Sequence, residues 1–132
     1  MPRRLIHMSG HRYGTAVARY FEAWNADSAE GIAKAVAAAW AEDGTYTDPL
    51  AEAAGHDAIA AVIGAARAQF PGFAFRLLGA VDGHHDIARF GWELVSVADG
   101  TAPVAGSDVI TLAEDGRIRA VAGFLDRVPP TA

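Results

Sequence analysis

Apolar positions in the first half of the chain recur at intervals of three and four residues, the spacing of one buried helical face. Three such stripes predict three helices. The first helix is predicted over residues 15–25, the second between a loose capping box with Asp27 as the cap and a turn at Asp43-Gly44, and the third between Gly55 and Pro71. The stripes consist of Val17, Tyr20, Phe21 and Trp24, then Ile32, Val36, Ala39 and Trp40, and finally Ile59, Val62, Ile63, Ala66 and Phe70.

The second half alternates apolar and polar residues with the period of β-strands. A short strand, 45–48, comes before the third helix and stops at Pro49, which cannot donate to a central ladder. Four longer strands follow, separated by Asp-Gly pairs, which are strong hairpin signals. This order predicts an α+β domain in which helices cover one face of a strongly curved sheet. The longer strands are predicted over 73–81, 87–97, 103–113 and 117–128, with turns at Asp82-Gly83, Asp99-Gly100 and Asp115-Gly116.

Composition narrows the classes of function. The chain has 132 residues, a formal net charge of −5, no cysteine, and Lys34 as its one lysine. The missing cysteines exclude disulfides, thiolate nucleophiles and cysteine-bound metals, and a cytoplasmic location is expected. The negative charge argues against binding nucleic acid, and no apolar run is long enough to span a bilayer. No cofactor is expected, since phosphate-loop and dinucleotide motifs are missing.

The length fits one domain. We expect this domain over residues 14–128, a loose arm over 1–13 and a tail over 129–132. Met8 is an alternative to Met1 as the first residue of the protein.

Four segments of the chain carry a resemblance to a known superfamily. Together they resemble the nuclear transport factor 2-like (NTF2-like) domains, and within them the SnoaL-like polyketide cyclases and the ketosteroid isomerases. The resemblance extends from about residue 14 to 128 and implies a cone, with three N-terminal helices packed on a strongly curved, mainly antiparallel sheet and a pocket between them. It also implies a homodimer formed through the outer sheet face. The segments are 18–25, 40–49, 55–59 and 108–118.

The resemblance to the ketosteroid isomerases implies three site residues. Asp48 corresponds to the general base, and Tyr20 and Asp108 correspond to the oxyanion hole. The sequence pattern also places Tyr20 on an apolar helical stripe and gives Asp108 the strand parity of Ile110 and Leu112. Burial of an aspartate in such a place disfavours its charged form and raises its pKa toward the range useful in acid–base catalysis.

Other interpretations of these residues stay open. Tyr20 could be a core tyrosine that satisfies its own hydroxyl, and Asp48 could serve only the turn. Asp108 could pair with Arg89 or Arg119 across the sheet.

Two further groups of residues compete for a role. The SnoaL-like cyclases place a base on a late strand, and Asp126 lies in a loosely similar position, where it could equally be a surface partner of Arg127. His84-His85-Asp86 suggests a metal site, but consecutive residues of a hairpin point in opposite directions, so no metal is expected.

The leading interpretation is a SnoaL-like enzyme that isomerises or cyclises an apolar carbonyl compound without a cofactor. Asp48 would abstract a proton next to the carbonyl, and Tyr20 and Asp108 would stabilise the enolate. The alternatives are a non-catalytic module that binds a hydrophobic ligand, or a dimeric scaffold. Large side chains are expected to form the pocket wall or, alternatively, simply to close the core: Trp40, Ile63, Phe90, Trp92, Val121 and Leu125.

Overall fold

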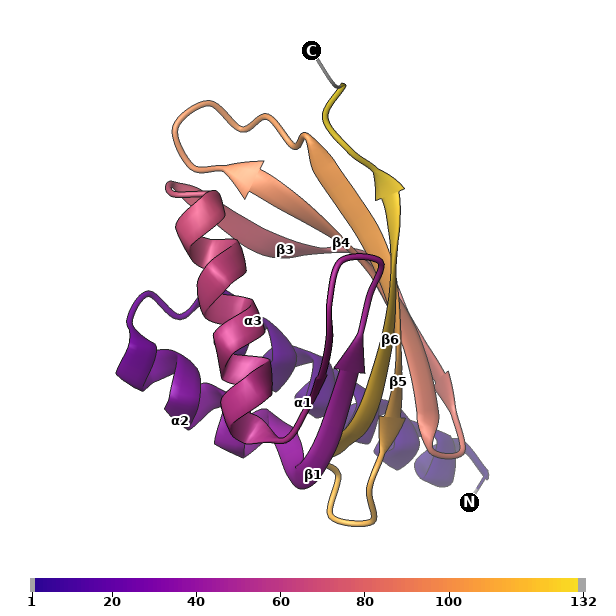
Figure 1. Cartoon of the computed structure of the whole chain (residues 1–132). Coiled ribbons are helices and arrows are strands. Elements are labelled where there is room, and N and C mark those ends of the chain that lie inside the picture. Colours follow the sequence, from indigo (N-terminus) through magenta and orange to yellow (C-terminus); the bar gives the residue numbers. More distant parts are fainter. Residues whose placement is uncertain (1, 131–132) are drawn as a thin grey trace.

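The first helix is longer than the sequence predicts. The computed structural model describes residues 2–130, and α1 runs over Pro2–Asn25 (Figure 1). Proline suits the start of a helix because its missing N–H would have no partner there. The expectation of a loose arm is therefore wrong for residues 2–13, while residue 1 lies outside the described residues. Tyr13 is buried, and its hydroxyl donates to the carbonyl of His85 over 2.8 Å, which fixes α1 to the sheet.

The second helix is shorter than predicted. α2 spans Ala29–Ala39, and its N-cap is Ser28 rather than Asp27, since the Ser28 hydroxyl accepts from the N–H of Gly31. The chain then passes directly into strand β1, Trp40–Thr47, so Asp43-Gly44 does not end a helix. Gly44 serves packing instead, because a Cβ there would lie 2.7 Å from the Trp40 ring.

The sheet has six strands within residues 2–130, in the order β2-β1-β6-β5-β4-β3. β1 pairs in parallel with β6, and every other neighbouring pair is antiparallel. The predicted meander of four long strands is confirmed, and the three-residue β2 was not predicted. Of the expected tail, residues 129–130 have neither helix nor strand, and 131–132 lie outside the described residues. The remaining strands are β2 (Glu52–Ala54), β3 (Phe73–His84), β4 (Ile87–Ser96), β5 (Val104–Leu112) and β6 (Ile118–Arg127).

The hairpin between β3 and β4 turns later than predicted. β3 continues through Asp82-Gly83 to His84, and the chain reverses at His85-Asp86, where His85 has a positive φ of 49°. Gly83 is needed for helix packing, because a Cβ at this position would lie 2.6 Å from the Tyr13 ring. The turns at Asp99-Gly100 and Asp115-Gly116 lie where they were predicted, and both glycines have positive φ.

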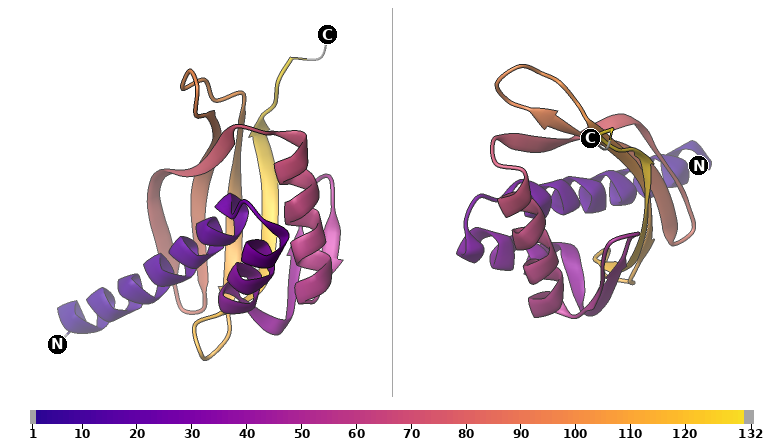
Figure 2. Two further views of the ribbon diagram at one scale, coloured as in Figure 1. Left: turned by 90° about the vertical axis from the view of Figure 1, so that its left-hand side faces the viewer. Right: turned by 45° about the horizontal axis from the view of Figure 1, so that its top comes forward.

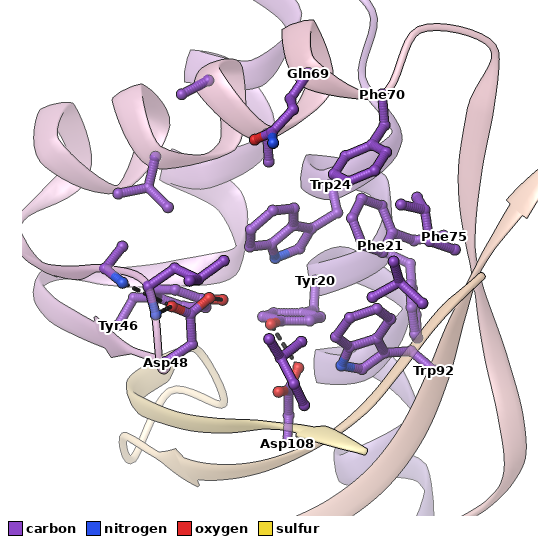
Figure 3. A pocket seen from close by; sticks show the side chains of 18 residues that line it. Tyr20, Phe21, Trp24, Tyr46, Asp48, Gln69, Phe70, Phe75, Trp92 and Asp108 are labelled. Carbon is purple, nitrogen blue, oxygen red and sulfur yellow. Dashed lines mark hydrogen bonds between the residues drawn. The ribbon is translucent and has the colours of Figure 1, made fainter. Parts of the chain in front are cut away.

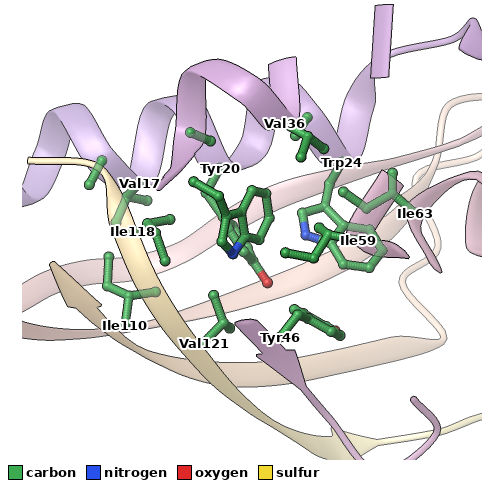
Figure 4. Packing of buried hydrophobic residues seen from close by; sticks show 14 of the residues in the cluster. Val17, Tyr20, Trp24, Val36, Tyr46, Ile59, Ile63, Ile110, Ile118 and Val121 are labelled. Carbon is green, nitrogen blue, oxygen red and sulfur yellow. The ribbon is translucent and has the colours of Figure 1, made fainter. Parts of the chain in front are cut away.

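The helices cover the concave side of the sheet (Figure 2). α1 packs against β3 and α2, and α3 (His56–Gln69) packs against α2 and β1. Apolar side chains from both layers form the core between them (Figure 4). The predicted α+β architecture, three helices on a curved and mainly antiparallel sheet, is confirmed. Core residues include Val17, Val36, Ile59, Ile110 and Ile118.

Candidate active site

A cavity of about 290 Å³ lies between the helices and the sheet. At one end its walls are buried residues of α1 and the sheet, such as Tyr20 and Asp108. At the other end its walls include the exposed residues Leu50 and Gln69, so the cavity opens to solvent between the β1–β2 loop and the C-terminal end of α3. The wall is mostly aromatic and aliphatic; Tyr20 and Asp108 lie together, and Gln69 lies far from this pair (Figure 3).

Tyr20 and Asp108 form a hydrogen-bonded pair at this closed end. Tyr20 lies on the buried face of α1 and Asp108 on the inward face of β5, and the Tyr20 hydroxyl donates to Asp108 Oδ2 over 2.6 Å. Both side chains are almost fully buried, with exposed fractions of 3% and 2%. Packing of the helix on the sheet therefore joins two residues that are far apart in the sequence.

A glycine makes room for the Asp108 carboxyl. Gly123 on β6 is the cross-strand partner of Asp108, and a Cβ at position 123 would lie 2.7 Å from Asp108 Oδ1. The same Cβ would lie 3.4 Å from the Cβ of Asp48, so both aspartates approach the bare backbone of Gly123. Gly106 makes room for Trp92 in the same way, because a Cβ at position 106 would overlap the indole ring of Trp92.

Tyr46 and Asp48 form a second pair on β1 and the loop that follows it. The Tyr46 hydroxyl donates to Asp48 Oδ2 over 2.5 Å, while Oδ1 accepts from the backbone N–H groups of Leu50 and Ala51, each over 2.8 Å. Three donors thus hold the Asp48 carboxylate and shape the β1–β2 loop. This geometry agrees with the alternative interpretation of the sequence, in which Asp48 serves the turn.

The closed end of the cavity disfavours negative charge. Burial raises the pKa of Asp108 to about 6, the charges of Asp48 and Asp126 add to the rise, and hydrogen bonds from Tyr20 and Trp92 oppose it. Burial also raises the pKa of Tyr20 well above its usual value, so its phenol stays a neutral donor. Among the described side chains that line the cavity, none is lysine, arginine or histidine. An acid that titrates near neutrality next to a neutral donor can accept a proton and return it.

Comparison with known proteins places this chain in a family. Residues 17–121 match the SnoaL-like domain, which is most of the chain. The chain belongs to the SnoaL-like family. A solved structure of a proposed isomerase of this family from Agrobacterium tumefaciens is 44% identical, with a TM-score of 0.83 over 88% of this chain and 98% of that one.

More distant structures share the fold of this SnoaL-like domain. A proposed SnoaL-like polyketide cyclase from Jannaschia is 18% identical, with a TM-score of 0.72 over 89% of this chain and 87% of that one. A proposed polyketide cyclase from Sinorhizobium meliloti is 20% identical, with a TM-score of 0.64 over 83% and 93%. A comparison with proteins of curated function gives no match.

Only part of the expected pocket wall of the SnoaL-like domain faces the cavity. Trp92 and Leu125 line it, together with Tyr20, Asp48 and Asp108. The other four expected wall residues belong to the closed core, because they point into the layer between helices and sheet. These four residues are Trp40, Ile63, Phe90 and Val121.

Asp126 lies outside the cavity, as do Arg89 and Arg119, the two arginines considered as partners of Asp108. Asp126 is exposed where the β5–β6 register shifts between Ala105 and Gly106, and it does not line the cavity. Arg89 pairs with Asp82 at the surface over 3.2 Å, and Arg119 is exposed. The inward strand position of Asp108 is therefore not explained by a cross-sheet ion pair with either arginine.

Trp24 and Tyr46 line the cavity but were not predicted as site residues. Both had a signal in the sequence. Trp24 follows Tyr20 by one helical turn, and Tyr46 comes two residues before Asp48, which puts each on the same face as a predicted site residue. Phe21 and Phe75 complete the aromatic wall.

Among the side chains that the structure describes, those of residues 11–130, no group of three or more His, Asp or Glu is arranged to hold a metal ion. His84, His85 and Asp86 are exposed at the tip of the β3–β4 hairpin. No helix within residues 2–130 is both long and apolar enough to cross a membrane.

Proposed function

We propose that this SnoaL-like domain is a cofactor-independent enzyme that transfers a proton at a carbon next to a carbonyl, and so isomerises or cyclises an apolar small molecule. The observation that carries the proposal is Asp108, a buried carboxyl in an apolar cavity with a pKa of about 6 and a tyrosine donor on Oδ2. A proton acceptor works best when its pKa lies near the pH of the reaction.

The geometry favours Asp108 as the base, whereas the resemblance implies that Asp48 has this role. Three hydrogen bonds already hold the Asp48 carboxylate at the start of the β1–β2 loop. Asp108 accepts from Tyr20 on Oδ2, while its Oδ1 lies over the bare backbone of Gly123.

The cavity also limits the substrate. Its aromatic wall suits a small ring system, and its volume lies near the lower end of ordinary ligand pockets. The described lining offers no cation that could bind a carboxylate or phosphate group of a substrate. Asp48 and Asp108 would repel such an anionic group. The fitting substrate is an uncharged ketone or aldehyde.

In the proposed reaction, Asp108 takes a proton from the carbon next to the carbonyl. The electron pair of the broken C–H bond forms the enolate double bond, and the negative charge moves to the carbonyl oxygen. For an isomerisation, protonated Asp108 returns the proton to a different carbon of the conjugated enolate. For a cyclisation, the enolate carbon attacks a second carbonyl of the same molecule, and the proton goes to the new alkoxide.

Exchange of α-protons in D₂O tests this function without knowledge of the natural substrate. The probe is 2-tetralone, an apolar bicyclic ketone, and proton NMR follows the loss of its α-proton signals. Asp108→Asn should slow the enzymatic exchange by about 10²–10⁴-fold. Asp48→Asn should slow it far less, and Asp27→Asn, at an exposed position outside the cavity, should leave it unchanged. A large loss in Asp48→Asn with activity kept in Asp108→Asn would reverse the assignment.

The second candidate function is binding without catalysis. It is supported by the pairing of Tyr20 with Asp108 and of Tyr46 with Asp48, which gives each carboxyl a partner inside the protein. A module of this kind would bind 2-tetralone but leave its exchange rate at the solvent value.

The expected homodimer also stays a proposal. Apolar side chains on β3, β5 and β6 are exposed and would be covered by a second copy of the sheet. They are Leu78, Val109 and Phe124.

A further inference from the structure

Trp24 carries an unpaired hydrogen-bond donor at the closed end of the cavity. Its side chain is 6% exposed and lines the cavity, yet its Nε1–H has no hydrogen-bond partner among the described residues. Buried donors are nearly always paired, so a donor left free at a binding site indicates an acceptor that arrives with the ligand.

The other unpaired buried donor in the described part of the chain is different. Arg67 Nε lies outside the cavity, and the same guanidinium already donates through Nη1 to the carbonyl of Phe73 over 2.6 Å, which ties α3 to β3. Trp40 has an indole in the core whose N–H donates to the carbonyl of Thr45 over 3.3 Å. The free N–H of Trp24 is therefore a feature of the cavity.

Aromatic packing fixes the direction of the Trp24 indole. The centroid of its ring lies 5.6 Å from the ring centroid of Tyr46 and 5.0 Å from that of Phe75. The ring centroid of Tyr20, one helical turn away, lies at 6.2 Å. The N–H edge faces the Tyr20 hydroxyl (Figure 3), near enough to oppose the rise in the pKa of that phenol but not in hydrogen-bond geometry. A donor held in this way needs no reorganisation when charge develops beside it.

We propose that the Trp24 indole N–H binds the carbonyl oxygen of the ligand and stabilises the negative charge that forms there when Asp108 removes the α-proton. This inference rests on the proposed function and specifies its substrate: an uncharged molecule with one carbonyl oxygen at the closed end of the cavity. The Tyr20 hydroxyl and the Trp92 indole already serve Asp108. The Tyr46 hydroxyl donates to Asp48, so Trp24 carries the buried donor that is left for the oxygen. A single neutral N–H suits a ketone or aldehyde, whereas a carboxylate would need a cation.

The test removes the N–H while keeping the shape of the indole. Trp24 is replaced by benzothienylalanine, in which sulfur stands for N–H, and Trp24→Phe serves as a genetically encoded second variant. The same benzothienyl replacement at Trp40 is the control, because the Trp40 N–H is paired outside the cavity. Three quantities are measured: affinity for 2-tetralone, affinity for tetralin, which lacks the carbonyl, and the carbonyl stretching frequency of bound 2-tetralone.

Loss of the Trp24 N–H should weaken 2-tetralone binding by about threefold to tenfold and leave tetralin binding unchanged. The carbonyl stretch, lowered in the unmodified protein, should return toward its value in an apolar solvent. The exchange rate should fall by about 10²–10³-fold, the usual cost of losing one oxyanion donor. The replacement at Trp40 should change none of these quantities.

These results separate the inference from the function on which it rests. If no variant exchanges protons but the carbonyl preference depends on the Trp24 N–H, the donor site stands and the catalytic proposal fails. If exchange depends on Asp108 but not on the Trp24 N–H, the function stands and the inference is wrong. Equal affinities for 2-tetralone and tetralin, or no binding of either compound, also overturn it.

Discussion

Replacing the Asp108 carboxyl with an amide of nearly the same shape should stabilise the folded protein at neutral pH. The ionised carboxyl is buried, and its pKa rises from an ordinary value of 3.8 to about 6. Asp108→Asn removes the buried charge while its side-chain oxygen can still accept from the Tyr20 hydroxyl. An amide that is better tolerated than the native acid would mark Asp108 as a residue kept for its chemistry at a cost in stability.

The size of the effect follows from the change in pKa. At about 1.36 kcal/mol per pKa unit, the rise from 3.8 to about 6 costs the folded state about 3 kcal/mol once Asp108 is ionised. Below pH 3.8 the acid is protonated in both the folded and the unfolded state, and there is no cost. As the pH rises toward 6 the unfolded state releases the proton first, so stability falls, and above 6 the cost is constant.

Urea unfolding of the native protein and of Asp108→Asn at pH 4 and pH 7.5 measures this difference. The free energy of unfolding of the variant, relative to the native protein, should increase by roughly 2.5 kcal/mol between the two pH values, because part of the cost is already present at pH 4. Comparing the two pH values cancels any packing change that the amide introduces. Asp27→Asn, at an exposed position, provides the control. A relative stability that stays constant across this range would refute the burial of an ionisable Asp108.

Three more predictions concern the site and the assembly. The rate of α-proton exchange should rise with a midpoint near pH 6, since ionised Asp108 accepts the proton, and an NMR profile with a midpoint near 3.8 would contradict this. Gly123→Ala should reduce the exchange rate at least tenfold, because its Cβ meets Asp108 Oδ1 at 2.7 Å. Circular dichroism checks that this variant folds, and an unchanged rate in a folded variant would remove the role of Gly123. Phe124→Glu combined with Val109→Glu should convert the proposed dimer to a monomer in sedimentation analysis, whereas a native monomer would disprove the dimer.

The candidate site was partly predictable because strand and helix periodicity report which residues point inward. The stripe containing Tyr20 and the parity of Asp108 with Ile110 and Leu112 correctly indicated burial. The same rules place Trp24 beside Tyr20, but a tryptophan in an apolar stripe has no local sign that its N–H is left unpaired. The free donor becomes visible only when every neighbour of the indole is known.

Two of the errors in the predicted fold have the same physical origin. Gly44 and Gly83 follow aspartates, and both pairs were interpreted as turns. In the structure these glycines lie in strands under the rings of Trp40 and Tyr13, which leave no space for a Cβ. A glycine that permits a turn and a glycine that permits close packing look the same in a single sequence.

The sequence by itself determined the order of helices and strands, the turns at Asp99-Gly100 and Asp115-Gly116, and the family of the fold, since these depend on local periodicity and on short segments. The tertiary structure decided which aromatic side chains line the cavity and which fill the core. It also decided that Asp48 is held by three donors while Asp108 accepts from a tyrosine of another layer. Proton affinity depends on solvation and on neighbours distant in the chain, and only the packed arrangement of helices and sheet specifies both.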